Sequence, residues 1–364
     1  MRINYNFING AFCEILEDNN RKYYIQFIDK KTNQIVYDEV INSNMWIRSA
    51  FCYFIDYRIK IIDFETKHLI DQIDYDARNK NVYIWFDSSS LGDNISWIPF
   101  VEEFRLKHNC NVYCSTYQNA LFKKMYPNII FIPHGTELNN LYASYSIGCF
   151  EDKTKEKVNW KSLNNQEICA NILGIDYKEI KPPIKITNNK KNINGKYVVI
   201  STRSTAACKE WNNESGWKDV VLYLNQKGYK VVAIQKEKDT IFDDKRLNLI
   251  HCDSVDINHI LNLIYHSEFV IGLSSGISWL AWALNKPCVL ISGMSIEKNE
   301  FFTPFRIINK NVCYGCWNDE KYKFERGDWF WCPKLKDTDR QFECSKSITS
   351  KMVLEKINIL LNKN

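Results

Sequence analysis

The chain has 364 residues, more than one hydrophobic core usually organises, so two or three domains are expected. Apolar residues make up 45% and aromatic residues 14%, which is ample material for buried cores. The formal charge of +5 comes from 48 basic and 43 acidic residues that are well mixed along the chain. This balance argues against a nucleic-acid partner, which needs a clustered basic face, and it suits a small anionic ligand equally well.

The N-terminus lacks the basic start and apolar core of a secretion signal. The longest uncharged run, residues 269–285, is interrupted by Ser and Gly and followed by Lys286-Pro287, so it predicts strand, turn and helix rather than a membrane span. The 13 cysteines are odd in number, which is typical of a reducing compartment. We therefore expect a cytoplasmic protein without a membrane span.

Residues 1–78 predict a β-rich N-terminal domain. Asn9-Gly10 is a strong signal for a two-residue hairpin turn. Apolar and polar side chains alternate over four short stretches, residues 11–16, 23–28, 35–40 and 51–62.

Residues 79–187 change to a pattern of strand, loop and helix. The apolar stretch 82–86 predicts a buried strand, and the helix after it has Trp97, Val101 and Phe104 on one face. Pro99 is expected to kink that helix or to delay its regular start. Further strands are expected near residues 111–114 and 129–132.

A second series of strands and helices follows a linker containing Pro182-Pro183 and occupies residues 188–304. Strands are expected at 197–201, 230–234, 269–271 and 288–291. One helix has Trp217, Val220, Val221 and Leu224 on one face and ends before Gly228, and another carries Ile277, Leu280, Ala281 and Leu284. Two such domains predict an α/β fold with two parallel sheets that face a cleft.

Two loops of the second series could bind an anion. Ser274-Ser275-Gly276 lies between a strand and a helix, where backbone N–H groups and hydroxyls can meet a phosphate, although many α/β loops look alike without binding one. The segment 201–213 leaves the first strand of the same series. Its Thr205 and Lys209 could hold a diphosphate, and the alternative is a solvated loop with a surface lysine.

An acidic residue near a helix start is the candidate general base. Asp93, in Leu91-Gly92-Asp93, is either a helix N-cap or a base that takes a proton from an attacking hydroxyl. Asp87, directly after the preceding strand, and His134, in a loop, compete with it for that role.

Four cysteines near the C-terminus form the most specific motif of the chain. Their spacing is Cys-x2-Cys-x15-Cys-x11-Cys within a polar, aromatic segment that predicts loop, in the order Cys313, Cys316, Cys332 and Cys344. Four thiolates at this range can bind one tetrahedral metal, and the spacing alone favours zinc. Buried free thiols and disulfides are the alternatives. The segment is taken as residues 305–346, followed by a C-terminal helix at 347–364.

The chain resembles the bacterial autotransporter heptosyltransferases, which O-glycosylate self-associating autotransporter adhesins. These enzymes are related to the ADP-heptose-dependent heptosyltransferases of lipopolysaccharide. Leu91-Gly92-Asp93 and the cysteine motif carry much of the resemblance, which rests on four blocks, residues 85–104, 204–217, 272–287 and 312–344.

The resemblance implies a GT-B fold, with two Rossmann-like domains facing a cleft and the donor bound mainly by the C-terminal one. It implies an inverting transfer of heptose from ADP-heptose to serine hydroxyls of an autotransporter passenger. Asp93 is then the general base and Lys209 contacts the nucleotide. The other donor-binding residues are Thr205, Ser274, Ser275 and Gly276.

The resemblance also implies ferric iron in the four-cysteine site, in a structural role, with zinc as the alternative. No catalytic divalent metal is expected, because no Asp-x-Asp triplet lies near the loops. A homo-oligomer is implied, with the dodecamer as the form in the resembled family. Trp279 stands where the lipopolysaccharide enzymes typically have His, which favours a protein acceptor.

Two other functions remain open. A GT-B enzyme could transfer a sugar to lipopolysaccharide or another glycan. A zinc-knuckle protein could bind nucleic acid, but acidic residues are interspersed throughout residues 313–344, which disfavours it.

Overall fold

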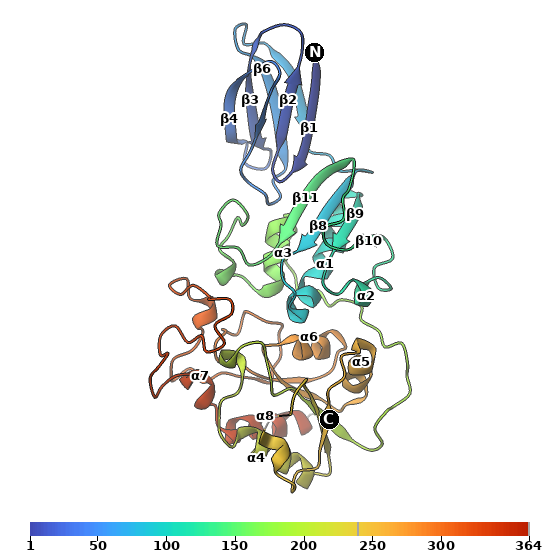
Figure 1. The fold of residues 1–364 in the computed structure, drawn as a ribbon, viewed down its shortest axis with the longest axis vertical. Coiled ribbons are helices and arrows are strands. Elements are labelled where there is room, and N and C mark those ends of the chain that lie inside the picture. The colour runs from blue at the N-terminus through green and yellow to red at the C-terminus, as the bar shows by residue number, and fades with distance from the viewer. Residues whose placement is uncertain (239, 363–364) are drawn as a thin grey trace. The chain divides into compact units, whose positions relative to one another are not determined.

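The computed structural model describes residues 1–238 and 240–362 and divides into two compact units (Figure 1). Each unit is built from three stretches of chain. The first unit comprises Met1–Ser89, Trp97–Trp160 and Gln166–Lys178. The second unit comprises Ser90–Ser96, Lys161–Asn165 and the chain from Glu179 onward.

Two of the sheets that the described residues form belong to the first unit. One has seven strands in the order β10-β9-β8-β11-β1-β2-β5, and the other has four in the order β4-β3-β6-β7. Their bounds are β1 Arg2–Ile8, β2 Phe12–Leu16, β3 Lys22–Asp29, β4 Gln34–Asn42, β5 Met45–Arg48, β6 Tyr57–Asp63, β7 Leu69–Asp74, β8 Asn81–Phe86, β9 Asn111–Ser115, β10 Ile129–Phe131 and β11 Leu141–Ile147.

β1 and β2 pair in antiparallel fashion around Asn9-Gly10, which confirms the predicted hairpin, and both residues have positive φ, 52° and 106°. The predicted two-residue turn is wrong, because Asn6 and not Phe7 lies opposite Phe12, and residues 9–11 separate the two strands. β1 also pairs in parallel with β11, with Phe7 opposite Ala143. Residues 1–78 therefore supply the four-stranded sheet and also extend the sheet of β8 to β11. The boundary between the two N-terminal domains stays a prediction.

Helix α1 spans Leu91–His108 without interruption and contains Pro99. The prediction that Pro99 delays the start of this helix is therefore wrong. The helix tolerates Pro99 because a proline removes only one backbone donor, here the N–H that would bond to the carbonyl of Ile95. Trp97, Val101 and Phe104 are fully buried, which confirms the predicted apolar face. The other two α-helices before the linker are α2, Asn119–Phe122, and α3, Asn165–Leu173.

The second unit is built on a parallel sheet of six strands among the described residues, in the order β14-β13-β12-β15-β16-β17. This order runs 3-2-1-4-5-6 along the chain, the arrangement of a Rossmann fold. The strands are β12 Tyr197–Ile200, β13 Lys230–Ile234, β14 Leu249–Cys252, β15 Val270–Leu273, β16 Cys288–Ile291 and β17 Arg306–Ile307. The helices are α4 Gly216–Gln226, α5 Ile257–His266, α6 Gly276–Ala283, α7 Glu343–Lys346 and α8 Ser350–Leu361.

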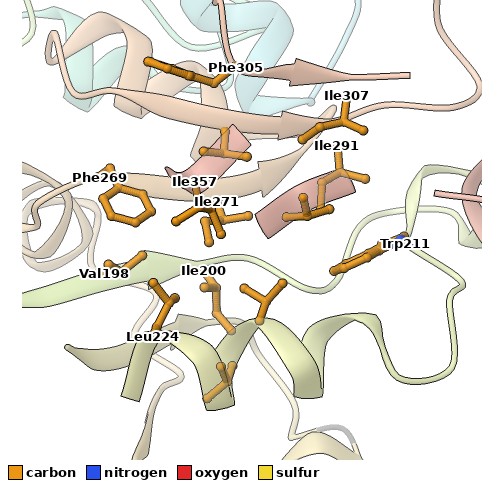
Figure 2. Packing of buried hydrophobic residues seen from close by; sticks show 14 of the residues in the cluster. Val198, Ile200, Trp211, Leu224, Phe269, Ile271, Ile291, Phe305, Ile307 and Ile357 are labelled. Carbon is orange, nitrogen blue, oxygen red and sulfur yellow. The ribbon is translucent and has the colours of Figure 1, made fainter. Parts of the chain in front are cut away.

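Figure 2 shows the core that packs on this sheet. Val220, Val221 and Leu224 of α4 are fully buried against it, which confirms the predicted stripe, and α8 contacts both α4 and the strands β16 and β17. Gly228, with φ of 83°, directly follows the C-cap of α4, as predicted. The C-terminal helix thus completes the fold of the second unit. None of the helices in the described ranges is both long and apolar enough to cross a membrane.

Candidate functional site

The two predicted anion-binding loops leave adjacent strands of the second unit. β12 lies beside β15 in the middle of the sheet, and the chain continues from β12 toward one edge and from β15 toward the other. In open parallel sheets, ligands bind at the carboxyl ends of the strands at this switch point. Segment 201–213 follows β12, and Ser274-Ser275-Gly276, here named the serine loop, follows β15. The fold therefore brings both loops to the position where a nucleotide is expected.

The serine loop has one hydroxyl that is engaged and one that lacks a partner. Ser274 donates its hydroxyl to Glu300. Ser275 is the N-cap of α6, and its buried Oγ has no hydrogen-bond partner among the described residues. Buried polar atoms are nearly always hydrogen-bonded, so an unpaired hydroxyl at the start of a helix suits a ligand.

Glu300, which sequence reasoning missed, organises this loop. Its Oε1 accepts from Ser295 Oγ at 2.7 Å and from Ser274, and its Oε2 lies 2.6 Å from Nη1 of Arg306. Burial of the carboxyl raises its pKa, but Arg306 and the two hydroxyls together lower the pKa by more. The pKa of Glu300 therefore lies below its ordinary value. Glu300 is therefore ionised and holds Ser274 through a charge-assisted hydrogen bond.

Lys209 lies in a short 3-10 turn, Ala207–Lys209, that rests on the cysteine segment. The backbone N–H of Ala207 donates to the carbonyl of Trp329 at 3.0 Å, and Nζ of Lys209 lies 5.7 Å from the ring centroid of Trp317. Within residues 1–238 and 240–362, no carboxylate pairs with Lys209 at ion-pair distance, and Thr205 is exposed. The loop thus offers a positive charge and a hydroxyl to an anion.

The Leu-Gly-Asp segment contacts the serine loop. A Cβ at Gly276 would lie 2.8 Å from Cβ of Leu91, and a Cβ at Gly92 would lie 2.7 Å from Cδ1 of Trp279. Both glycines are therefore needed for close approach. Asp93 is half-buried in the first turn of α1 rather than at its N-cap, and its Oδ1 accepts from the side-chain amide of Asn165 at 3.2 Å.

The competing candidates lie in the first unit. Asp87 is exposed after β8, and His134 is exposed and contacts Tyr117 with the two rings tilted and their centroids 4.6 Å apart. Of the three candidate bases, Asp93 belongs to the second unit, in the segment that contacts the serine loop.

The four cysteines of the motif are free thiols. Burial is the main reason that the pKa of Cys344 is raised, to about 12, and the thiols of Cys332 and Cys313 add to the effect. Burial and the other three thiols likewise raise the pKa of Cys316. Gly315, with φ of 74°, forms the turn of the Cys-x2-Cys pair. Across the described chain, no three His, Cys, Asp or Glu side chains meet at metal-ligand spacing.

The cysteine segment packs directly on the Lys209 loop. Their shared apolar cluster contains Ala206, Ala207, Cys208, Met294, Trp331, Cys332 and Phe342. Cys208, a fifth cysteine that the motif did not include, is buried among them, and it raises the pKa of Cys316 and Cys344. The segment therefore supports the candidate nucleotide site, which its spacing alone could not indicate.

The Rossmann-type sheet, with a candidate base beside one of its two candidate anion-binding loops, has the architecture of a nucleotide-binding enzyme. Residues 156–328 match the model of glycosyltransferase family 9 (heptosyltransferase), which makes the class of the protein a glycosyltransferase. The chain is 35% identical over 362 residues to the autotransporter heptosyltransferase BAHTCr of Citrobacter rodentium, covering 96% of this chain and 87% of the relative. The chain therefore belongs to the autotransporter heptosyltransferase family, which confirms the resemblance.

A solved structure agrees over the whole chain. The crystal structure of the iron-containing dodecameric glycosyltransferase TibC from enterotoxigenic Escherichia coli is 31% identical, with a TM-score of 0.92, covering 100% of this chain and 96% of that one. TibC has also been solved in complex with ADP-D-beta-D-heptose. A further relative, from Burkholderia thailandensis, is an inactive autotransporter heptosyltransferase and is 28% identical over 96% of this chain and 84% of its own length.

Proposed function

We propose that this protein transfers heptose from ADP-heptose to serine hydroxyls of an autotransporter passenger, with inversion at the sugar carbon. The observation that carries the proposal is the packing of Leu91-Gly92 on Gly276 and Trp279, which brings Asp93 to the serine loop at the switch point of the sheet. The similarity to TibC, solved with ADP-heptose, supports the donor. Trp279 in place of His supports a protein acceptor.

In the proposed reaction Asp93 accepts the proton of the attacking hydroxyl. The hydroxyl oxygen forms a bond to the anomeric carbon, the bond from that carbon to the β-phosphate oxygen breaks, and its electron pair leaves with ADP. A positioned base typically contributes about 10²–10⁴-fold to such a step. The proton ends on the Asp93 carboxylate and passes to water after ADP leaves.

The departing diphosphate needs positive charge and donors. Lys209 supplies the charge, while Thr205, the unpaired hydroxyl of Ser275 and the N-terminus of α6 supply donors. Gly276 keeps the approach to the backbone open, and Ser274 is fixed by Glu300. These groups act without a divalent metal in the proposed scheme.

Iron is proposed for the four-cysteine site, and zinc is the alternative. Cys313, Cys316, Cys332 and Cys344 fit a metal because all four are free thiols of one segment and because Cys313 and Cys332 lie near enough to raise the pKa of Cys316 and Cys344. TibC is iron-containing. Four sulfur ligands would fill a tetrahedral site, so the metal would be structural and would stabilise the segment under Lys209.

The remaining parts of the proposal concern place and assembly. A homo-oligomer is proposed because TibC is dodecameric. The enzyme is proposed to act in the cytoplasm on a passenger before its secretion. The proposed arrangement is a GT-B fold with a cleft between its two Rossmann-like domains. Its parts are residues 1–78, 79–187, 188–304 and 305–346, followed by a C-terminal helix.

The test is co-expression with the passenger of an autotransporter adhesin encoded beside this protein, followed by mass spectrometry for heptose-sized adducts on serine. The experiment is needed because one relative is inactive. Asp93→Asn should abolish the adducts while binding ADP normally, and the exposed Asp87→Asn is the matched control. Adducts at wild-type level with Asp93→Asn would reject the base, and their absence with the wild type would reject the acceptor.

A further inference from the structure

Asn165 contacts the candidate base and comes from a distant part of the sequence. It is the first residue of α3, and it is buried. Its Nδ2 donates to Oδ1 of Asp93 at 3.2 Å and to Oγ of Ser96 at 2.8 Å. Ser96 in turn donates to the backbone carbonyl of Asp93 at 2.9 Å. Asn165 thus binds both the carboxylate and the helical turn that carries it.

The chemistry of the pair sets the direction of this hydrogen bond. An ionised carboxylate can only accept, so the amide nitrogen of Asn165 must face Asp93. The two hydrogens of that nitrogen match its two acceptors. The backbone N–H of Asn165 is bonded to the carbonyl of Asn299 at 2.9 Å, which anchors the residue at the other side.

Asn299 connects this anchor to the two other parts of the site. Its side-chain amide donates to Oε1 of Glu300 at 3.2 Å, the oxygen that also accepts from Ser274. Its Oδ1 accepts from Asn318 at 3.0 Å, and Asn318 lies two residues after Cys316. A continuous chain of hydrogen bonds therefore runs from Asp93 through Asn165 and Asn299 to the serine loop and to the cysteine segment.

We infer that Asn165 is a positioning residue that fixes the Asp93 carboxylate relative to the diphosphate-binding serine loop. The inference rests on the proposed function. A base that takes a proton from a hydroxyl must lie within hydrogen-bond reach of it, and small misplacements are costly. Asn165 sets one carboxylate oxygen by a direct hydrogen bond and ties its own backbone to the loop that holds Ser274.

The test compares Asn165→Ala and the isosteric Asn165→Asp with wild type, using purified protein, ADP-heptose and the passenger shown to be modified on co-expression. Asn165→Ala should lower kcat by about ten- to hundredfold, because the base loses its orientation. Asn165→Asp should lower kcat further, since two carboxylates would then face each other. The KM for ADP-heptose and the affinity for ADP alone should each change by less than about twofold.

Asn262 is the matched control. It is also a buried asparagine of the second unit, and its amide donates to two backbone carbonyls, those of Asn188 and Lys190, at 2.7 and 3.0 Å. Asn262→Ala should lower the melting temperature and leave kcat unchanged. A similar loss of kcat in Asn262→Ala, or a normal kcat in Asn165→Ala, overturns the inference. Loss of ADP binding in both Asn165 variants overturns it as well, because the residue would then serve the fold.

The outcomes separate this inference from the proposed function. If Asp93→Asn is inactive and both Asn165 variants are fully active, Asp93 remains the base and only the positioning role fails. If Asp93→Asn is active, the proposed mechanism itself fails.

Discussion

Nζ of Lys209 lies 5.7 Å from the ring centroid of Trp317, the residue that directly follows Cys316. The contact joins the charge proposed for the diphosphate to the segment proposed for the metal. A lysine over an indole face is attracted by the ring's negative electrostatic potential, so Trp317 limits where the ammonium group can lie.

Trp317→Leu should weaken ADP binding without abolishing it. A cation–π contact contributes about 0.5–2 kcal/mol, which corresponds to an affinity about two- to thirtyfold lower. Calorimetry with ADP measures the change. Trp317→Phe keeps an aromatic face and is the matched variant, so an equal loss in both would show that packing and not the ring's charge distribution matters.

Lys209→Ala should weaken ADP binding more strongly than Trp317→Leu, because it removes the charge itself. The expected loss is at least tenfold, from about 1.5–3 kcal/mol for a hydrogen bond to a charged group. Lys227→Ala, at the exposed C-terminus of α4, is the control and should bind ADP normally. Unchanged affinity in Lys209→Ala would exclude Lys209 from the nucleotide site.

Gly92→Ala should disturb the contact between the Leu-Gly-Asp segment and α6. The added methyl would lie 2.7 Å from Cδ1 of the buried Trp279, and overpacking of this kind costs about 1–3 kcal/mol. Both the unfolding free energy and kcat should fall. Combining it with Trp279→Leu should restore part of both, since neighbouring changes are not additive. A strictly additive double variant would contradict the proposed contact.

Glu300→Gln should destabilise the protein at neutral pH by about 3–5 kcal/mol, because it leaves the buried Arg306 without its partner. The pKa of Glu300 is lowered from 4.5 in the folded state, so its stabilisation is complete above that pH and is lost as the pH falls through the folded pKa. The difference from wild type in urea unfolding should therefore shrink in acid. Glu297→Gln, in the exposed pair with Lys310, should cost at most about 1 kcal/mol at any pH.

Cys332→Ser should remove bound metal and reduce folded protein. Elemental analysis of the purified wild type is expected to find iron, and zinc in its place would select the alternative metal. Cys288→Ser is the matched control, because Cys288 is equally a buried free thiol but lies in β16, outside the cysteine segment. A folded, metal-free Cys332→Ser protein that binds ADP would contradict the structural role.

Local sequence pattern was sufficient for the elements with strong periodicity or turn chemistry. The buried strands β12, β13 and β16, the stripe of α4 and the hairpin at Asn9-Gly10 were all predicted. Strand β14 has only four residues and a histidine among them, and it was missed. Helix α5 was missed too, although its Ile257, Leu261 and Ile264 stand at helical spacing that the sequence shows. The pairing of β1 with β11 was missed for another reason, since it joins residues 136 apart, as with Phe7 and Ala143.

The candidate site divides in the same way. Asp93, Lys209 and the serine loop stand in recognisable motifs, and the structure brings the Leu-Gly-Asp segment to the serine loop. Asn165 and Glu300 stand in no motif. Their roles come from side-chain hydrogen bonds to Asp93 and Ser274, 72 and 26 positions away, and periodicity carries no information about such pairs.

The makeup of the second unit limits how this enzyme can be dissected. Because Ser90–Ser96 and Lys161–Asn165 group with the chain that starts at Glu179, a recombinant fragment beginning at the linker would carry the nucleotide loops but neither Asp93 nor Asn165. In chimaeras that exchange C-terminal halves between relatives, Asp93 and Asn165 would likewise pack against loops from a different protein. Crossovers that transplant all three stretches together are the ones expected to yield working hybrids.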